Sequence, residues 1–313
     1  MGLTSRAEPV SRDRYEVEVG GRTLRLSNLD RVLYPSTGFT KGDLIDYYEA
    51  VSPALVPHLA ARPLTMRRFP EGVEHPGFWE KRCPAHRPDW VRTASIWSSS
   101  NEETMDYCLV EDAATLIWAA NLADIELHTS LATAEHREQP TSIVFDLDPG
   151  EPADVIDCAA IAVLLREMFG EIGLKTFVKT SGSKGLQLYA PLNSDISYEQ
   201  TRPFAHEVAR SFESQMPEKV VSKMKRSLRP GKVFIDWSQN AEHKTTVCVY
   251  SMRAREEPSV STPVTWGEVE GALDSGRASD LAFGPQEVLR RVERDGDLFA
   301  ELLSMEQALP GLQ

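Results

Sequence analysis

The sequence predicts an α+β protein in which a ferredoxin-like β-α-β-β-α-β unit follows an N-terminal α/β module. Three observations support this class. Apolar residues alternate along short segments that predict strands, apolar residues recur at helical spacing between them, and Gly and Pro mark the boundaries. The 313 residues, 41% of them hydrophobic with 19 Gly and 20 Pro, have the composition of a globular protein. This length suits one large domain or two closely packed modules.

The N-terminal α/β module is expected over residues 1–140. In "YEVEVGGRTLRLS", apolar residues alternate on both sides of Gly20 and Gly21, which predicts a hairpin. The segment "TKGDLIDYYEAVSPALVPHL" predicts a helix capped by Thr40. The segment "PLTMRRFPEGVEHPGFWEKR" predicts a strand followed by a loop, and "ATLIWAANLADIELHTS" a short helix that leads into a strand.

The β-α-β-β-α-β unit is expected over residues 141–264. Its elements are a strand at 143–148, a helix at about 152–172, the strands "LKTFVKT" and "LQLYAPL", the helix "SYEQTRPFAHEVARSFESQM" and the strand "KVFIDWS". The first and last strands are neighbours in this ferredoxin-like or RNA-recognition-like topology. A further strand, "TTVCVYSM", and an acidic helical cap over residues 265–313 follow, and all three parts are expected to form one compact catalytic domain.

The bulk charge argues against unselective binding to nucleic acid. The formal net charge is -13, whereas such binding depends on neutralising phosphates with Lys and Arg. Residues 219–235 are nevertheless locally basic and contain no acid; their cations are Lys219, Lys223, Lys225, Arg226, Arg229 and Lys232. Binding, if present, is therefore expected to be local and selective.

The four cysteines, Cys83, Cys108, Cys158 and Cys248, are far apart in sequence and form no C-x-x-C pair. This spacing indicates neither a structural zinc site nor a disulfide framework, so we expect buried free thiols. The N-terminus has no apolar signal region, and no apolar run is long enough to span a membrane. A soluble cytoplasmic protein, associated with the nucleoid, is the expectation.

Asp146 and Asp148 end the strand "SIVFDLDPG". Because side chains alternate along a strand, these two carboxylates share one face, whereas Ile143, Phe145 and Leu147 occupy the other. They are too far apart for a hydrogen-bonded acid–base pair, but both can reach divalent cations that lie between them. Oxygen ligands of this kind select Mg²⁺ or Mn²⁺. A solvated strand end is the alternative.

Asp236 in "KVFIDWSQN" strengthens the metal interpretation. It lies between Ile235 and Trp237 on the strand that the topology places beside the first two aspartates. Three carboxylates on adjacent strands can hold two metal ions about 4 Å apart, an arrangement that activates an attacking oxygen and stabilises a leaving pyrophosphate.

A glycine-containing turn and a basic run offer phosphate contacts. In "KTSGSKGLQLY", Ser181, Ser183 and Lys184 lie in a turn between two strands, where backbone amides and the lysine can cradle a triphosphate. The run "KRSLRPGK" at 225–232, which includes Arg229, leads directly into the strand of Asp236. A tight hairpin with an exposed lysine is the alternative for the first segment.

Aromatic residues between cations point to stacking on bases. Phe78 and Trp79 in "HPGFWEKR" follow Arg67 and Arg68, and this combination is typical of proteins that bind single-stranded nucleic acid. A buried aromatic pair is the alternative. His128 falls on the polar face of its predicted strand, where a surface histidine is the simpler interpretation.

These segments together resemble the archaeo-eukaryotic primase superfamily and, within it, the polymerase domain of bacterial ligase D. The resemblance covers nearly the whole chain and rests on "LSNLDRVLYPSTGFTKGDLIDYY", "RRFPEGVEHPGFWEK", "FDLDPG", "TSGSKGLQLY", "KVFIDWSQN" and "KTTVCVYSMRAR". No ligase or nuclease segment accompanies them, which predicts a stand-alone relative or an isolated domain.

The resemblance implies a primase-polymerase fold and a template-directed nucleotidyltransferase that repairs gaps or ends in DNA, with a preference for ribonucleotides. It implies metal-binding catalytic acids at Asp146, Asp148 and Asp236, two Mn²⁺ or Mg²⁺ ions, and NTP or dNTP substrates. The residues implied around the nucleotide are His128, Ser181, Ser183, Lys184, Arg229, Gln239 and Arg253. Those implied for DNA are Asn28, Arg31 and Lys41 at a downstream 5′-phosphate, with Phe78 and Trp79 on template bases. The implied partners are gapped or recessed DNA, a separate DNA ligase and Ku, with the chain itself a monomer.

The chain departs from the family pattern at three positions. Arg31 replaces the usual lysine, which keeps the charge but changes a point contact into a fork. Trp79 replaces one of two stacking phenylalanines, and Gln187 replaces a frequent histidine, so that any role of that position is in doubt.

Two alternatives of other classes remain open from the sequence. A haloacid-dehalogenase-like phosphatase also begins with an apolar strand and D-x-D, but Gly150 stands where that family has Thr or Val. A non-catalytic RNA-recognition-like module would not need three carboxylates on a surface that binds phosphate.

Overall fold

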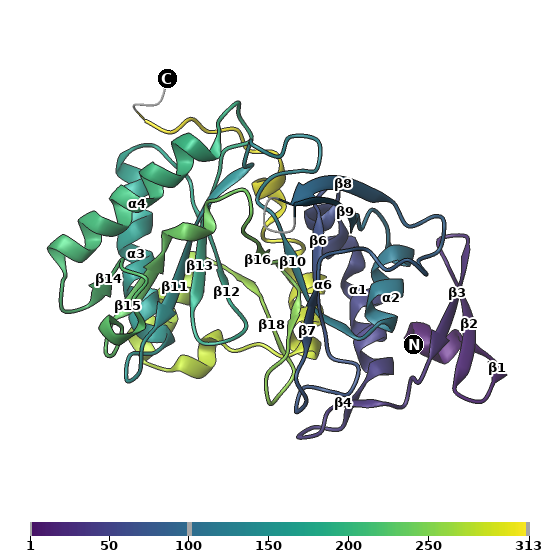
Figure 1. The fold of residues 1–313 in the computed structure, drawn as a ribbon. Coiled ribbons are helices and arrows are strands. Elements are labelled where there is room, and N and C mark those ends of the chain that lie inside the picture. The colour runs from purple at the N-terminus through teal and green to yellow at the C-terminus, as the bar shows by residue number, and fades with distance from the viewer. Residues whose placement is uncertain (1, 99–101, 311–313) are drawn as a thin grey trace. The chain divides into compact units, whose positions relative to one another are not determined.

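The computed structural model describes residues 2–98 and 102–310, which form two compact units (Figure 1). The first unit comprises Met1–Thr129, Tyr250–Val260 and Gly284–Gly296. The second comprises Ser130–Val249, Ser261–Phe283 and Asp297–Gln313. The chain therefore passes between the units several times.

The first unit is built on small antiparallel sheets and helices. Its elements are η1 (Leu3–Arg6), β1 (Glu8–Ser11), β2 (Arg14–Val19), β3 (Arg22–Ser27), β4 (Val32–Tyr34), β5 (Phe39–Thr40), α1 (Lys41–Leu59), β6 (Leu64–Arg68), β7 (Phe78–Glu80), β8 (Thr93–Ser98), β9 (Glu103–Cys108), α2 (Ala113–Asn121), β10 (Asp124–Thr129), β17 (Met252–Arg253), β18 (Ser259–Val260) and α6 (Pro285–Asp295).

Local sequence explains the predicted parts of this unit. The β2–β3 hairpin turns at Gly20 and Gly21, both with positive φ, as a tight hairpin requires. Thr40 caps α1, because its side chain accepts a hydrogen bond from the amide of Asp43 while the Asp43 carboxylate accepts one from the amide of Thr40. The predicted hairpin, helix and N-cap are confirmed.

A second antiparallel sheet of this unit contains strands in the order β10-β6-β7. The register of β10 against β6 shifts between Asp124 and Glu126, which is a bulge. The aromatic segment expected to be a loop instead forms β7, with Trp79 opposite Arg67 and Phe78 opposite Arg68. That expectation was wrong because the backbone of this segment pairs with β6, and the Pro and Gly signals before it gave no sign of this pairing.

The second unit contains the expected β-α-β-β-α-β order. Its elements are β11 (Ser142–Pro149), α3 (Val155–Glu171), β12 (Phe177–Thr180), β13 (Leu186–Pro191), α4 (Tyr198–Gln215), β14 (Val220–Val221), η2 (Arg226–Leu228), β15 (Val233–Asp236), η3 (Trp237–Gln239), β16 (Thr246–Val247), β19 (Pro263–Val264), α5 (Trp266–Ser275), η4 (Ala278–Leu281) and η5 (Ala300–Leu303).

One six-stranded sheet organises this unit, in the order β14-β15-β11-β13-β12-β19. The middle four strands follow the ferredoxin-like order, so the first and last strands of the unit, β11 and β15, are neighbours as predicted. The segment "TTVCVYSM" is not one continuous strand. It contains the two-residue strand β16 and the first residue of β17, since the chain turns after Val247 and enters the first unit at Tyr250.

The core of the second unit lies between this sheet and its helices. Ile143, Phe145 and Leu147 of β11 pack with α3 and α4, which lie side by side on one face of the sheet (Figure 1). Val269 and Ala272 of α5 join the same core. The other face of β11 is left for the polar side chains that alternate with the apolar ones.

The division into units differs from the linear modules expected at 1–140, 141–264 and 265–313. Residues Tyr250–Val260 and α6 belong to the first unit, where β17 pairs with β18 and α6 packs against α1. The C-terminal region is helical, as expected, but it contributes to both units instead of forming a separate cap.

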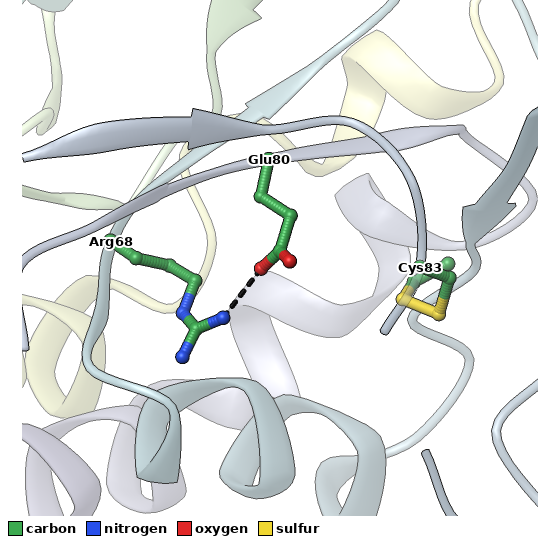
Figure 2. The surroundings of a disulfide bond; sticks show 4 residues. Arg68, Glu80 and Cys83 are labelled. Atoms are coloured by element: carbon green, nitrogen blue, oxygen red, sulfur yellow. Dashed lines mark hydrogen bonds and ion pairs between the residues drawn. A yellow bond between two sulfur atoms is a disulfide. The ribbon is translucent and has the colours of Figure 1, made fainter. Parts of the chain in front are cut away.

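Two of the four cysteines form a disulfide, so the expectation of four free thiols was wrong. Cys83 and Cys108 are bonded, with their Cα atoms 4.9 Å apart and a sequence separation of 25 (Figure 2). The amide of Cys83 donates to the carbonyl of Asp106 on β9, and this contact brings the two cysteines together. Cys158 and Cys248 are free and buried.

Among the described residues, no helix combines the length and apolar character needed to cross a membrane.

Candidate functional site

The three predicted acids lie on one face of the sheet in the second unit. Asp146 on β11 is directly opposite Asp236 on β15, and opposite Gln187 on β13. Asp148 is two residues further along β11 and lies on the same face, because Phe145 and Leu147, which alternate with the two aspartates, are fully buried on the other. The predicted adjacency of these strands is what brings the acids together.

The negative charge of this group is concentrated. Burial raises the pKa of Asp146 to about 7, with the Asp148 carboxylate as the next cause and Asp236 adding to it. A hydrogen bond with Gln187 and the charge of Lys179 act in the opposite direction. Like charges held this close favour either a shared proton or a bound cation.

The carboxylate of Asp236 is hydrogen-bonded by the residues that follow it in the sequence. One carboxylate oxygen accepts hydrogen bonds from the amide of Ser238 at 3.0 Å and from its hydroxyl at 2.6 Å, and the other accepts from Gln239 Nε2 at 3.0 Å. Within residues 2–98 and 102–310, no group of three or more His, Cys, Asp or Glu side chains is arranged to hold a metal ion, the three aspartates included.

The donor chemistry of the acids nevertheless fits a hard divalent cation. All three side chains offer carboxylate oxygens, and a cation would offset the repulsion that Asp148 and Asp236 add to the effect of burial at Asp146. Gln239, predicted at the nucleotide, is oriented by Asp236. Metal binding by these residues stays a prediction.

The turn after β12 is ordered around Ser181. Its hydroxyl accepts hydrogen bonds from the amides of Ser183 and Gly185, each at 3.2 Å. A Cβ at Gly185 would come within 1.9 Å of the carbonyl oxygen of Leu147, so only glycine allows the turn to pack against β11. Lys184 is exposed and pairs with Glu151 at 2.6 Å. The turn thus lies beside the strand of the acids, with a cation at its edge.

The basic run is fixed to the end of β11. The amide of Gly231 donates to the carbonyl of Gly150, and the amide of Gly150 donates to Lys232. A Cβ at Gly150 would clash with the carbonyl of Arg229 at 2.1 Å. Arg229 lies over the ring of Phe234, 3.7 Å from its centroid. The run is therefore anchored beside the end of β11, and delivery of its cations to the acids stays a prediction.

Lys179 is a buried cation that the sequence analysis missed. Only 1% of it is exposed, and its Nζ lies 2.5 Å from Ser261 Oγ. It faces Gln187 across β12 and β13, so that Asp236, Asp146, Gln187 and Lys179 form one row across four strands. The alternation in "FVKTSG" could have placed this lysine on the polar face of the sheet.

His128 and Arg253 belong to the first unit, where Glu126 joins them. His128 Nε2 lies 3.0 Å from Glu126 Oε2, and Arg253 Nε lies 3.3 Å from Glu126 Oε1. His128 is buried, which lowers its pKa, so the surface histidine considered above is not the case. Sequence reasoning passed over Glu126, although the spacing "ELH" places its side chain on the same strand face as His128.

Phe78 and Trp79 are exposed beside two arginines. The guanidinium of Arg67 lies 5.1 Å from the Trp79 ring centroid, and that of Arg68 lies 5.2 Å from Phe78. Arg68 also pairs with Glu80 (Figure 2), with 2.6 Å between Nη1 and Oε2. The exposure of Trp79, 54%, rules out a buried aromatic pair and leaves its ring accessible to a base.

The three residues predicted at a 5′-phosphate come together at the start of α1. The amide of Lys41 donates to the carbonyl of Arg31, and the amide of Arg31 donates to that of Asn28. Lys41 is buried with its Nζ 3.4 Å from Ser27 Oγ, and burial, followed by the charges of Arg31 and Arg68, lowers its pKa to about 8. A buried lysine close to the charges of Arg31 and Arg68 makes a site suited to an anion.

Comparisons with known proteins identify relatives of this chain. A family model described as "LigD, primase-polymerase domain" matches residues 40–299. The chain is 42% identical over 285 residues to the multifunctional non-homologous end joining DNA repair protein LigD of Mycobacterium tuberculosis, covering 88% of the chain and 36% of that protein. The Bacillus subtilis bifunctional non-homologous end joining protein LigD is 32% identical over 288 residues, or 92% of the chain and 45% of the relative.

A solved structure of high similarity is the polymerase domain from Mycobacterium tuberculosis ligase D in complex with DNA. It aligns with a TM-score of 0.83 and 40% identity, covering 91% of this chain and 99% of that one. The chain therefore spans less than half the length of the full-length relatives above but nearly all of this domain.

Proposed function

Because this chain belongs to the LigD primase-polymerase domain family, we propose that it is a template-directed nucleotidyltransferase that fills short gaps or extends ends in DNA repair. Its relatives are named for non-homologous end joining, and that process is the proposed setting. The phosphatase and the non-catalytic module receive no support from these similarities.

The presence of three carboxylates on one face of one sheet carries this proposal. Asp146 faces Asp236 across neighbouring strands, and Asp148 follows on the same face. These residues would hold two divalent ions, Mn²⁺ or Mg²⁺. Such ions would supply activation of the attacking primer oxygen and stabilisation of the leaving pyrophosphate.

The residues around the acids suit a nucleoside triphosphate. Ser181 orders the turn beside β11, Lys184 lies at the turn, and Arg229 is held at the end of the basic run. The cations of Lys184 and Arg229 would bind and orient phosphate oxygens. In the first unit, His128 and Arg253 offer an imidazole and a guanidinium. We propose that His128 and Ser181 contact the 2′-hydroxyl and that these contacts give a preference for ribonucleotides.

The DNA contacts proposed for the first unit are of two kinds. Phe78 and Trp79 would stack on template bases, with Arg67 and Arg68 tracking the backbone. The site at Asn28, Arg31 and Lys41 would bind a downstream 5′-phosphate. A separate DNA ligase and Ku are proposed as partners in the same repair process.

Primer extension across a short gap in duplex DNA tests this function. The wild-type chain is expected to add the templated nucleotide only when a divalent metal is present. Asp146→Asn and Asp236→Asn should each lower extension by at least about 10³-fold while DNA binding persists, because they remove metal ligands and leave the first unit unchanged. The exposed helix residue Asp274, changed to Asn, is the matched control for loss of a carboxylate from the second unit.

Extension by the Asp146 variant at the wild-type rate would contradict the assignment of the acids. Phosphate release without extension would instead favour the phosphatase.

A further inference from the structure

Glu126 is a buried carboxylate that gathers several cationic and polar partners. Its side chain is 2% exposed. One oxygen meets His128 Nε2 at 3.0 Å, and the other accepts from the amide of Ala254 at 3.0 Å. The guanidiniums of Arg67 and Arg253 lie 3.1 and 3.3 Å from its oxygens.

A bulge in β10 sets the position of the Glu126 carboxylate. The bulge between Asp124 and Glu126 shifts the register of β10, so that Glu126 lies opposite Arg67 and His128 lies opposite Thr65. Glu126 and His128 are two residues apart on one strand, so their side chains share a face. The backbone thus places the acid beside its imidazole partner.

Charge keeps Glu126 ionised. Burial by itself would raise the pKa of Glu126, but the hydrogen bond from His128, the charge of Arg253 and the amide of Ala254 hold it well below 4.5. Burial lowers the pKa of His128, and the cations of Arg253 and Arg67 reinforce this, against the effect of Glu126. A neutral imidazole beside a carboxylate is therefore the resting pair.

The partner of Nε2 assigns the tautomer of His128. A neutral imidazole carries one N–H, and an ionised carboxylate can only accept, so the proton lies on Nε2. Nδ1 is then an acceptor, which is the role required for a hydrogen bond from a ribose hydroxyl. The opposite tautomer would present a donor at Nδ1, and the Glu126 carboxylate would then face an Nε2 that carries no proton.

The same carboxylate reaches the exposed tryptophan through two partners. The rings of His128 and Trp79 meet edge to face with centroids 4.7 Å apart, and the Arg67 guanidinium lies 5.1 Å from the Trp79 ring. Trp79, Arg67 and Glu126 are also register partners across β7, β6 and β10. A change at Glu126 therefore alters both neighbours of Trp79.

We propose that Glu126 is a positioning residue that fixes the His128 tautomer and the Arg67–Trp79 stack together, so that selection of the ribose and stacking on the template are set by one buried carboxylate. This inference rests on the proposed nucleotidyltransferase function.

The test compares Glu126→Gln with the control Glu80→Gln, which removes a carboxylate paired with Arg68 on β7 next to Trp79. Nitrogen NMR of the labelled wild-type chain should show the Nε2–H tautomer of His128, and Glu126→Gln should shift it towards a mixture. In extension assays, Glu126→Gln should lower the NTP over dNTP ratio of kcat/KM about tenfold. It should also weaken quenching of 2-aminopurine at the templating position. Glu80→Gln should leave the His128 tautomer and the ribose ratio unchanged.

Glu126→Asp is the second variant in case Glu126→Gln fails to fold. It keeps a charge beside Arg253 but withdraws the oxygen from His128 by about one bond length, so the tautomer and the ribose ratio should still change. Unchanged NMR signals and an unchanged ratio in a folded variant would overturn the role of Glu126. Absence of extension by the wild type would reject the nucleotidyltransferase function instead, and the NMR result would still decide the tautomer.

Discussion

We predict that binding of a 5′-phosphate at the proposed Lys41 site depends on pH. Its ammonium is buried, and burial, then the charges of Arg31 and Arg68, lower its pKa from 10.5 to about 8. Raising the pH through this value removes a positive charge from the site. The perturbation is therefore a pH series on DNA with and without the phosphate.

The expected change in phosphate affinity with pH follows from proton linkage. A phosphate dianion beside Lys41 favours the charged amine, which returns its pKa towards 10.5, so binding takes up a proton once the pH exceeds about 8. With these two pKa values, affinity for the phosphate falls about tenfold between about pH 7 and about pH 9, or about 1.4 kcal/mol. The phosphate itself is already a dianion across this range.

In the free protein, deprotonation of Lys41 changes the free energy of unfolding in the opposite direction. The folded state binds fewer protons at Lys41 than the unfolded state does between a pH of about 8 and 10.5. Its free energy of unfolding therefore gains from this residue as the pH rises through that window, while phosphate binding weakens.

Fluorescence anisotropy on gapped DNA measures the effect, with constant ionic strength and with chelator to exclude metal effects at Asp146. The quantity compared is the ratio of Kd values for 5′-hydroxyl and 5′-phosphate DNA. Lys41→Arg is the matched control, because a guanidinium stays charged over the whole range and should abolish the pH dependence. Lys41→Ala should lose both the dependence and about 1 to 3 kcal/mol of phosphate affinity.

A Kd ratio that stays constant with pH in the wild type would refute this reasoning. So would the same pH dependence in Lys41→Arg, since the titrating group would then be another residue.

Three further predictions concern the ribose, the template and the disulfide. His128→Ala and Ser181→Ala should each lower the NTP over dNTP ratio of kcat/KM about tenfold, and an equal loss for both sugars would assign them to the phosphates or to the turn. Trp79→Ala should weaken binding to a gapped template by about 1 to 3 kcal/mol. Trp97→Ala, which removes a ring 63% exposed on β8, should not, and equal effects would contradict stacking. Cys83→Ser should lower the free energy of unfolding by about 3 kcal/mol, because the bond closes a loop with a separation of 25 residues. Denaturant titration checks this against the reduced wild type, and identical stability of oxidised and reduced wild type would contradict it.

The arrangement of the second unit could be predicted because local patterns and chain topology agree. Alternation in "SIVFDLDPG" fixed which face holds Asp146 and Asp148, and the ferredoxin-like order placed the strand of Asp236 beside them. The start of α1 at Thr40 was predictable for the same reason, since its capping residues are adjacent in sequence.

Features that depend on distant segments could not be predicted. Glu126 pairs with two arginines only because Arg67 and Arg253, which are far apart in the chain, both lie beside it, on a strand whose register is shifted by a bulge. Cys83 pairs with Cys108 through a backbone contact that the sequence spacing does not reveal. The hydrogen bonds that hold Asp236 arise from the turn that follows it, whose conformation the strand pattern left open.

The late return of the chain to its first unit has a consequence during synthesis on the ribosome. α1 is complete at Leu59, but its partner α6 ends only at Asp295. At about 5 to 20 residues per second, translation between these points takes on the order of tens of seconds. The first unit cannot be completed before α6 is synthesised, so the surface of α1 that packs against α6 stays uncovered until then.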